Sequence, residues 1–308
     1  MVSQYKIAAY ITAYEDSEAV MNCINAIQSQ SVSVEKLLIL DNSSQEPLLG
    51  LVNADNIEIK FHPENIGIGA GLSWAIAWSI EQDYDFLWTF DQDSIPQKDC
   101  LIQLLSGYES IKLSQDSIGI IAPTAIDYRS HQTVPGAIFY RDCFTPCQPQ
   151  NQEKYYECDA PITSGSLIVL SAAKTVSLPR TDLFIDGIDL DYGLRLKQAG
   201  FHNFIVISAI MQHNFGTPVQ IKFFHKKRSL QKYSALRHYY ICRNHTYLET
   251  RYAQGVYQIS SIMRRIKYML SNMFWIMLYD FDNQQLKLWA CVLGTYHGLT
   301  GKLGKIWL

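Results

Sequence analysis

The sequence predicts an α/β fold, in which a mostly parallel mixed sheet is flanked by helices. Three observations lead to this prediction. Short runs of β-branched and apolar residues recur along the first half of the chain. Segments between them carry apolar residues at helical spacing. The chain has 308 residues, of which 48% are hydrophobic, so it is long enough to bury a sizeable core. Strand, helix and strand in alternation favour a parallel sheet with helices on its faces.

The first half contains four predicted strands, at residues 6–12, 36–40, 57–61 and 86–90. A helix over residues 17–29 is predicted between the first two, because its apolar residues recur at the spacing of one helix face. Ser17 is its predicted N-terminal cap. A second helix is predicted over residues 69–82, between the third and fourth strands.

The second half begins with a looser region, residues 124–157, which holds three prolines and no sustained periodicity. We expect a long irregular excursion or a pair of hairpins there. A strand at 166–170, a helix at 189–199 and a strand at 206–211 follow, and Gly200 is the predicted C-terminal cap of that helix.

Beyond about residue 218, lysine, arginine, histidine and aromatic residues recur in helical phase. We therefore expect a catalytic domain over residues 1–217 and a C-terminal helical region over 218–308. The apolar stretch 268–281 is too short for the roughly 20 residues that cross a bilayer. Its basic neighbours Arg264, Arg265 and Lys267, with Trp275 and Tyr279 within it, allow it to lie in a membrane surface. Packing against its own domain or against a second subunit explains the same pattern.

Composition narrows the function. The formal net charge is −3 and 18% of the residues are charged. The chain therefore lacks the excess of basic residues that is typical of nucleic-acid-binding proteins. The N-terminus does not resemble a signal peptide, so we expect a cytoplasmic protein. The seven cysteines lack the paired spacing of a zinc site, and we expect reduced, packed thiols. A zinc cluster of Cys143, Cys147 and Cys158 is the weaker alternative.

Polar residues follow three of the predicted strands: Thr12-Ala13-Tyr14, Asp41-Asn42-Ser43 and Asp91-Gln92-Asp93. In such sheets ligands bind beyond the carboxyl ends of the strands, so we expect the three segments to meet at one edge. On an extended segment Asp91 and Asp93 point the same way and can face one divalent cation. A solvated turn is the simpler explanation of an isolated Asp-x-Asp.

Three carboxylates, Asp186, Asp189 and Asp191, stand at the entrance of the predicted helix 189–199. Favourable interaction with the helix dipole explains one or two of them. A general base must be ionised and within reach of a substrate hydroxyl, and a helix N-terminus at the active edge provides both. Asp189 is our candidate base, and Asp186 and Asp191 are alternatives that would otherwise bind acceptor hydroxyls. His213 follows another strand, where a third metal ligand or a diphosphate contact would be needed.

Taken in order, these segments resemble the inverting glycosyltransferases of family 2, which have the GT-A fold. The likeness extends over about residues 6–216 and includes Glu64-Asn65-Ile66-Gly67-Ile68-Gly69 and His213-Asn214-Phe215-Gly216. Asp-Gln-Asp-Ser at 91–94, Phe-Ile-Asp at 184–186, Tyr239-Tyr240 and Arg243-Asn244 look most like bacterial rhamnosyltransferases of surface polysaccharide synthesis.

The resemblance implies a role for each matching residue. Asp93 would be the principal metal ligand, with Asp91 toward the ribose or the metal and His213 at the diphosphate end. Asp189 matches the catalytic aspartate. The nucleotide-binding set would be Thr12, Tyr14, Asp41, Asn42, Asn65, Gly67 and Asp91. The acceptor set would be Ser164, Gly165, Asp186 and Asp191.

The implied cofactor is Mg²⁺ or Mn²⁺, the donor dTDP-rhamnose or a UDP-sugar, and the acceptor a glycan or a lipid-linked saccharide. The sequence departs from the family pattern at two places: Thr12-Ala13-Tyr14 stands where members often have Thr-Tyr-Asn, and Ile188 replaces the usual glutamate before Asp189. A nucleotidyltransferase would need a glycine-rich basic loop after the first strand, and residues 12–20 have none. A non-catalytic nucleotide-sugar-binding subunit is the alternative from another class.

Overall fold

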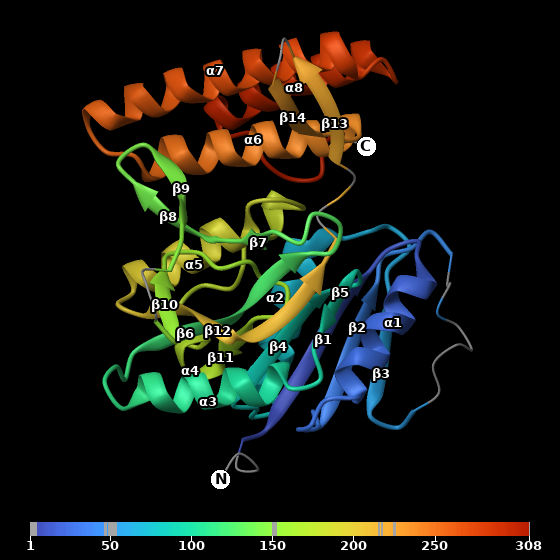
Figure 1. The fold of residues 1–308 in the computed structure, drawn as a ribbon, viewed down its shortest axis with the longest axis vertical. Coiled ribbons are helices and arrows are strands. Elements are labelled where there is room, and N and C mark those ends of the chain that lie inside the picture. The colour runs from blue at the N-terminus through green and yellow to red at the C-terminus, as the bar shows by residue number, and fades with distance from the viewer. Residues whose placement is uncertain are drawn as a thin grey trace. The chain divides into compact units, whose positions relative to one another are not determined.

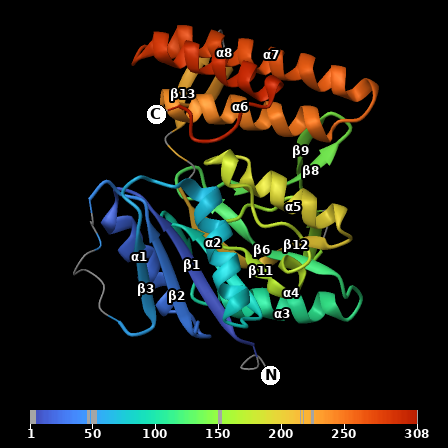
Figure 2. The same cartoon turned by 180° about the vertical axis from the view of Figure 1, so that it is seen from behind.

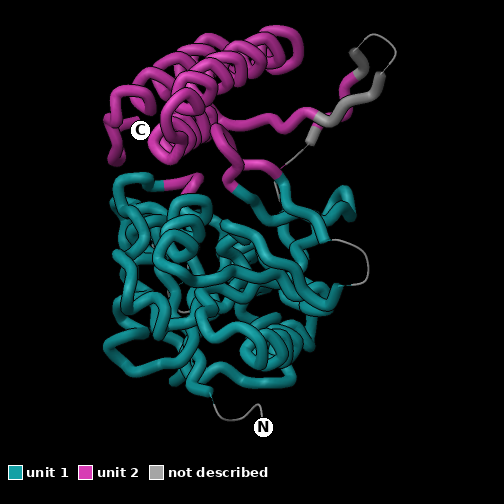
Figure 3. Tube along the Cα trace, turned by 90° about the vertical axis from the view of Figure 1, so that its left-hand side faces the viewer, with its two compact units in different colours: residues 1–138, 146–184, 188–214 teal, residues 139–145, 185–187, 215–308 magenta. Residues whose placement is uncertain are grey.

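The computed structural model describes residues 5–45, 48, 54–149, 153–214, 216, 218–223 and 226–307. The chain divides into two compact units, coloured separately in Figure 3. The first comprises Met1–Ile138, Pro146–Phe184 and Ile188–Asn214, and the second comprises Phe139–Thr145, Ile185–Gly187 and Phe215–Leu308. Phe215, part of the last motif quoted above, lies outside the described residues.

The first unit contains the predicted α/β fold. Its main sheet has the strand order β10-β12-β6-β11-β4-β1-β2-β3. The strands on this path are β1 Ile7–Ala13, β2 Lys36–Asp41, β3 Ile57–Phe61, β4 Phe86–Asp91, β6 Ile118–Asp127, β10 Tyr155–Cys158, β11 Leu167–Val169 and β12 His202–His213. Two short strands, β5 Ser94–Pro96 and β7 Thr133–Val134, pair with β12 and β6. A separate two-stranded pairing joins β8 Gly136–Tyr140 to β9 Cys143–Cys147.

Six of these strands run in the same direction. β1 pairs in parallel with β2 and β4, β2 with β3, and β6 with β12. β11 is antiparallel to both β4 and β6, so β4 and β6 are themselves parallel. The carboxyl ends of β1, β2, β4, β6 and β12 therefore lie at one edge of the sheet, as the sequence predicted for β1, β2 and β4.

Helices cover both faces of the sheet. They are α1 Ser17–Gln28, α2 Gly67–Glu81, α3 Cys100–Lys112, α4 Leu170–Ala173 and α5 Ile188–Gln198, with a short 3₁₀ turn at Thr181–Leu183. Figure 1 shows α1 and α3 in front of the sheet, and Figure 2, from behind, shows α2 and α5 in front of it. The layers bury the central strands β1, β2 and β4 almost completely, with Trp88 at 0% exposure in the middle of β4, whereas the edge strand β3 is partly exposed.

The helix caps test the sequence prediction in detail. α1 is capped by Asp16, whose carboxylate accepts a hydrogen bond from the Ala19 amide at 3.0 Å, and Ser17 is the first helical residue. The predicted cap was therefore wrong by one residue; a cap of this kind contributes about 1 kcal/mol. At the end of α5 the prediction is confirmed. Gly200 has a φ of +91°, and Phe201 donates back to the Leu196 carbonyl.

The second unit contains a β-hairpin and three helices. The hairpin, β13 Pro218–Phe223 and β14 Lys226–Gln231, replaces the start of the helical region that the sequence predicted from residue 218. The helices are α6 Ala235–Tyr252, α7 Val256–Tyr279 and α8 Gln284–Thr300. Gly294 and Gly298 let α8 approach α6 closely, because a Cβ at either position would lie 2.4 Å from a carbonyl oxygen of α6.

Buried polar groups also hold this helical unit together. The Arg243 side chain is 0% exposed and donates to the Asn244 side-chain oxygen at 2.7 Å and to the Gly304 carbonyl at 2.5 Å. Asp280 and Lys287 form a buried ion pair at 2.8 Å. Among the described residues, no helix is long and apolar enough to cross a membrane.

Candidate functional site

The carboxyl edge of the sheet brings the three predicted polar segments into register. Thr12 is paired with Asp91 across β1 and β4, and Ala13 is paired with Asp41 across β1 and β2. The Gln92 side chain forms two hydrogen bonds with the Tyr14 backbone. It accepts one from the Tyr14 amide at 2.6 Å and donates one to the Tyr14 carbonyl at 3.0 Å. Gln92 thus fixes the loop after β1 to the loop after β4, a role that its position between two aspartates did not reveal.

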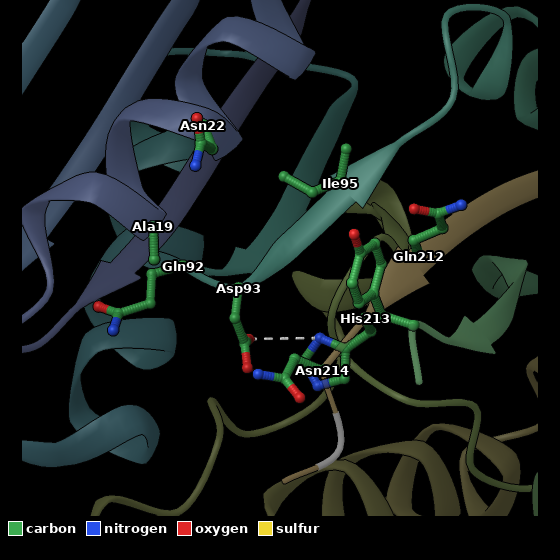
Figure 4. Close-up of a pocket in the computed structure, with 9 residues that line it drawn as sticks. Ala19, Asn22, Gln92, Asp93, Ile95, Gln212, His213 and Asn214 are labelled. Carbon is green, nitrogen blue, oxygen red and sulfur yellow. Dashed lines mark ion pairs between the residues drawn. The ribbon is translucent and has the colours of Figure 1, made fainter. Parts of the chain in front are cut away.

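A potential metal site is formed by Asp91, Asp93 and His213. One ligand atom from each lies within 4.8 Å of the others. The His213 Nδ1 is 3.4 Å from an Asp93 oxygen, the contact drawn as a dashed line in Figure 4. Two carboxylates and an imidazole form a donor set that suits Mn²⁺, and the carboxylates suit Mg²⁺. Asp93 keeps 35% of its side chain exposed, so a ligand can reach it.

Two buried serines support this cluster from behind. The Ser94 hydroxyl lies 2.6 Å from both the His213 Nδ1 and the Ser164 hydroxyl. Ser164 in turn accepts a hydrogen bond from the Asp91 amide at 2.9 Å. These contacts connect the two strand ends that carry the acidic residues and the histidine. The contact with Ser94 also fixes the orientation of the His213 ring, as partners of metal-binding histidines commonly do.

A hollow of about 180 Å³ opens beside Asp93 and His213 (Figure 4). Amide side chains dominate its polar lining. The lining residues are Ala19, Asn22, Gln92, Asp93, Ile95, Tyr128, Gln212, His213 and Asn214. The Asn214 side-chain oxygen is buried there without a hydrogen-bond partner among the described residues. Such an orphaned acceptor indicates a place where a donor group of a ligand can bind.

The predicted nucleotide-binding residues differ in accessibility. Asp41 and Asn42 are buried, and each accepts from a backbone amide, of Ser43 and Ile66 respectively, at 3.0 Å. Thr12 is half-buried and donates to the Tyr10 hydroxyl at 2.9 Å, whereas Tyr14 is exposed. Asp41 and Asn42 therefore shape the loops around the edge, while Thr12 and Tyr14 are more accessible to a ligand.

The loop before α2 depends on two residues with positive φ. Asn65, at +48°, accepts from the Gly67 amide at 3.0 Å, and Gly67 has a φ of +81°. A Cβ on Gly67 would lie 2.4 Å from the Phe184 ring. The glycine therefore allows this loop to pack directly on the segment that leads into α5. This contact explains physically why glycine is needed at position 67.

Asp189 stands in the first turn of α5, half-buried, and its carboxylate accepts from the Leu190 amide at 2.9 Å. A short turn after Gln198 leads α5 into β12, so α5 runs opposite to β12. Its N-terminus therefore lies toward the edge where β12 ends in His213. The sheet topology thus directs Asp189 and the Asp91, Asp93 and His213 cluster to the same edge.

The other two acidic residues have different surroundings. Asp191 is 2% exposed and forms an ion pair at 2.8 Å with Arg195, which also donates to the carbonyls of Ser177 and Leu178. Asp186 belongs to the second unit, where it pairs with Arg237 at 3.5 Å. These contacts give Asp191 a structural role, which was one of the two roles considered for it, and its binding to an acceptor stays a prediction.

Ser164 and Gly165, which were predicted to bind the acceptor, are both buried. The Gly165 carbonyl accepts a hydrogen bond from the Trp88 indole N–H at 2.8 Å, and the Gly165 amide donates one to the Thr89 carbonyl at 2.6 Å. A Cβ there would lie 2.4 Å from the Met211 sulfur. The segment therefore supports the end of β4 from inside the protein, and a contact with the acceptor stays a prediction.

The model of the family "Glycosyl transferase family 2" matches residues 9–169, which contain β1 through β11 and the paired aspartates. The chain belongs to glycosyl transferase family 2. The family model matches more than half of the chain, which is sufficient to show membership of the family. The search of curated proteins found no match.

Two solved structures place this family 2 chain among GT-A folds. The crystal structure of GalNAc-T7 with UDP, GalNAc and Mn²⁺ matches 68% of this chain at 14% identity and a TM-score of 0.55. The chain spans 43% of the length of that structure. S. aureus TarS 1-349 in complex with UDP matches 94% of this chain and 80% of its own, at 11% identity and a TM-score of 0.50. At such identities the likeness shows the fold alone.

Proposed function

We propose that this family 2 chain is an inverting glycosyltransferase, which moves a sugar from a nucleoside diphosphate donor to an acceptor hydroxyl. The observation that supports this most directly is the cluster of Asp91, Asp93 and His213 at the carboxyl edge, with Asp189 at the first turn of a helix that begins toward that edge. Metal-binding carboxylates and a separate candidate base are the two components of such a site.

Asp91, Asp93 and His213 would hold Mg²⁺ or Mn²⁺. A cation bound there neutralises charge on the departing nucleoside diphosphate. The hollow beside these residues offers amide groups from Gln92, Gln212 and Asn214, which can hydrogen-bond to ribose hydroxyls or phosphate oxygens. Ser94 and Ser164 keep the ligating side chains in place before the donor arrives. Positioning of this kind is worth 10–100-fold or so in metal affinity.

Asp189 takes the proton from the acceptor hydroxyl as its oxygen attacks the anomeric carbon. The bond from that carbon to the diphosphate oxygen breaks in the same displacement, so the configuration inverts. The helix N-terminus favours the ionised carboxylate that this role needs. Its neighbours are less suited: Asp191 is buried against Arg195, and Asp186 is paired with Arg237.

The donor we propose is dTDP-rhamnose, on the strength of the Asp-Gln-Asp-Ser and Phe-Ile-Asp segments. A UDP-hexose is the alternative, favoured by the UDP in both solved structures named above. We propose a glycan or lipid-linked saccharide as acceptor, in surface polysaccharide synthesis at the cytoplasmic side of the plasma membrane. A panel of nucleotide sugars, tested for thermal stabilisation and for hydrolysis, distinguishes the donors.

Asp189→Asn tests the proposed chemistry. We expect transfer to fall by about 10²–10⁴-fold, because the base is lost, with nucleotide affinity by calorimetry nearly unchanged. Asp191→Asn is the matched control on the same helix: it should lower the melting temperature by breaking the ion pair with Arg195, while the folded fraction retains transfer. Normal transfer by the Asp189 variant would exclude Asp189 as the base.

A further inference from the structure

The helix α7 in the second unit has apolar side chains on two opposite faces. The inner face packs within the unit: Ile276 is buried with Cys242 of α6 and Cys291 of α8, and Tyr268, Met269 and Met273 pack against this cluster. The inner face thus accounts for the packing of α7 on α6 and α8. It does not explain the apolar residues on the opposite side of the same helix.

The outer face forms a continuous stripe along the whole helix. Its apolar members are Val256, Ile259, Met263, Leu270, Phe274 and Met277. Their steps of three, four or seven residues place them on one side of a helix. Each exposes between 41% and 77% of its surface. At about 1.5 Å per residue the 24-residue helix is about 36 Å long. The stripe is therefore an extended apolar surface, whereas single exposed apolar residues are common on any protein.

Helix α7 contains Arg264, Arg265 and Lys267 and no acidic residue. Arg264 pairs with Asp142 at 3.3 Å and the buried Arg265 with Glu249 at 3.6 Å, so the positive charge of the outer stripe comes from Lys267. Lys267 is exposed and lies within the stripe itself, one turn from both Met263 and Leu270. An apolar stripe interrupted by a cation matches the chemistry of an anionic lipid surface.

A second copy of the chain fits this stripe less well. Lys267 lies at the midpoint of α7. In a two-fold symmetric pairing centred on the middle of the helix, it would therefore face the same lysine of the other copy. Two like charges inside an apolar contact repel and lose water. On a bilayer the lysine stem can lie on the apolar layer while its ammonium reaches a phosphate.

We propose that the outer stripe of α7 binds the surface of an anionic membrane. The helix lies parallel to the surface, with its apolar side chains among the upper acyl chains and Lys267 at the phosphates. The aromatic Phe274 suits this boundary, as aromatic residues do at membrane interfaces. This inference depends on the surface of the second unit and not on the proposed transfer reaction.

Flotation of the full-length protein with lipid vesicles tests the proposal. We expect the protein to float with vesicles that contain phosphatidylglycerol, and to float less with pure phosphatidylcholine or at high salt. Lys267→Glu, a surface substitution, should weaken binding to the anionic vesicles by about tenfold or more. Leu270→Glu combined with Phe274→Glu should leave the protein in the soluble fraction.

The matched control is Leu113→Glu, which changes an exposed leucine of the first unit and should float like the wild type. Thermal unfolding of every variant checks that it is folded. A wild-type protein that stays soluble with anionic vesicles, or a Lys267 variant that floats as well as the wild type, would overturn the proposal. So would a dimer, seen by analytical ultracentrifugation, that Leu270→Glu dissociates, because the stripe would then bind a second copy.

Discussion

Ser94→Ala should weaken metal binding although Ser94 is not itself one of the proposed ligands. The side chain is 0% exposed, and its hydroxyl lies 2.6 Å from both the His213 Nδ1 and the Ser164 hydroxyl. The substitution removes both hydrogen bonds and leaves two buried polar partners poorly satisfied. At about 1–2 kcal/mol for each, the expected destabilisation is about 2–4 kcal/mol.

Two measurements follow from this reasoning. The melting temperature should fall by about 2–4 °C for each kcal/mol in a unit of this size. The Mn²⁺ affinity, measured by calorimetry or electron paramagnetic resonance without any donor sugar, should fall about 10–100-fold, because the imidazole is no longer held in orientation. Magnesium can replace Mn²⁺ in the calorimetric experiment.

Ser208→Ala is the matched control. Ser208 lies on the same strand, β12, and its exposed hydroxyl donates to the Gln103 side chain at 2.9 Å. Both the melting temperature and the Mn²⁺ affinity should stay near wild-type values. A folded Ser94→Ala protein that binds Mn²⁺ as tightly as the wild type would refute the supporting role of this hydroxyl.

Three further predictions follow from the structure. Gly69→Ala should destabilise the protein by about 1–3 kcal/mol, because the added Cβ would lie 2.5 Å from the Arg180 carbonyl oxygen. The melting temperature measures this effect, and a Ser73→Ala variant in the same helix should melt like the wild type. Burial and the nearby Lys287 lower the pKa of His238 from 6.5 to about 4. As the pH falls from 6.5 toward 4, this histidine is protonated in the unfolded chain but not in the folded chain, and the folded protein loses stability. In urea unfolding, the wild type should therefore lose about 2 kcal/mol more than His238→Asn between neutral pH and about pH 5, and an equal loss in the two proteins would contradict this. Excess chelator should abolish sugar transfer, and Mn²⁺ or Mg²⁺ should restore it, whereas full activity in chelator would show that the cluster of Asp91, Asp93 and His213 has another role.

Much of the first unit could be predicted from local sequence. β1 to β4 begin and end within one residue of their predicted bounds, because each is a short apolar run next to turn residues. Polar segments after β1, β2 and β4 had to meet at one edge once the strands were parallel. The register confirms this, since Thr12 is opposite Asp91 and Ala13 opposite Asp41.

β6 was missed because its local pattern is interrupted. Pro123 lies inside the strand, where a proline usually argues against regular pairing. The partner strand β12 accommodates it with a break in register between Val206 and Ile210. The Tyr128 side chain, which lines the hollow beside Asp93, follows this strand and was missed for the same reason. Such compensation between distant segments is not visible in either segment alone.

The amino-acid sequence by itself determined the parallel sheet, its active edge and the residue types gathered there, because periodicity and strand-end chemistry are local properties. Tertiary packing decided which of those residues are accessible. Asp189 and Asp191 are two positions apart on one helix and so point to different sides, and the contacts of α5 bury Asp191 against Arg195 while Asp189 stays half-buried. Ser94 and His213, 119 residues apart, meet only because β5 pairs with β12.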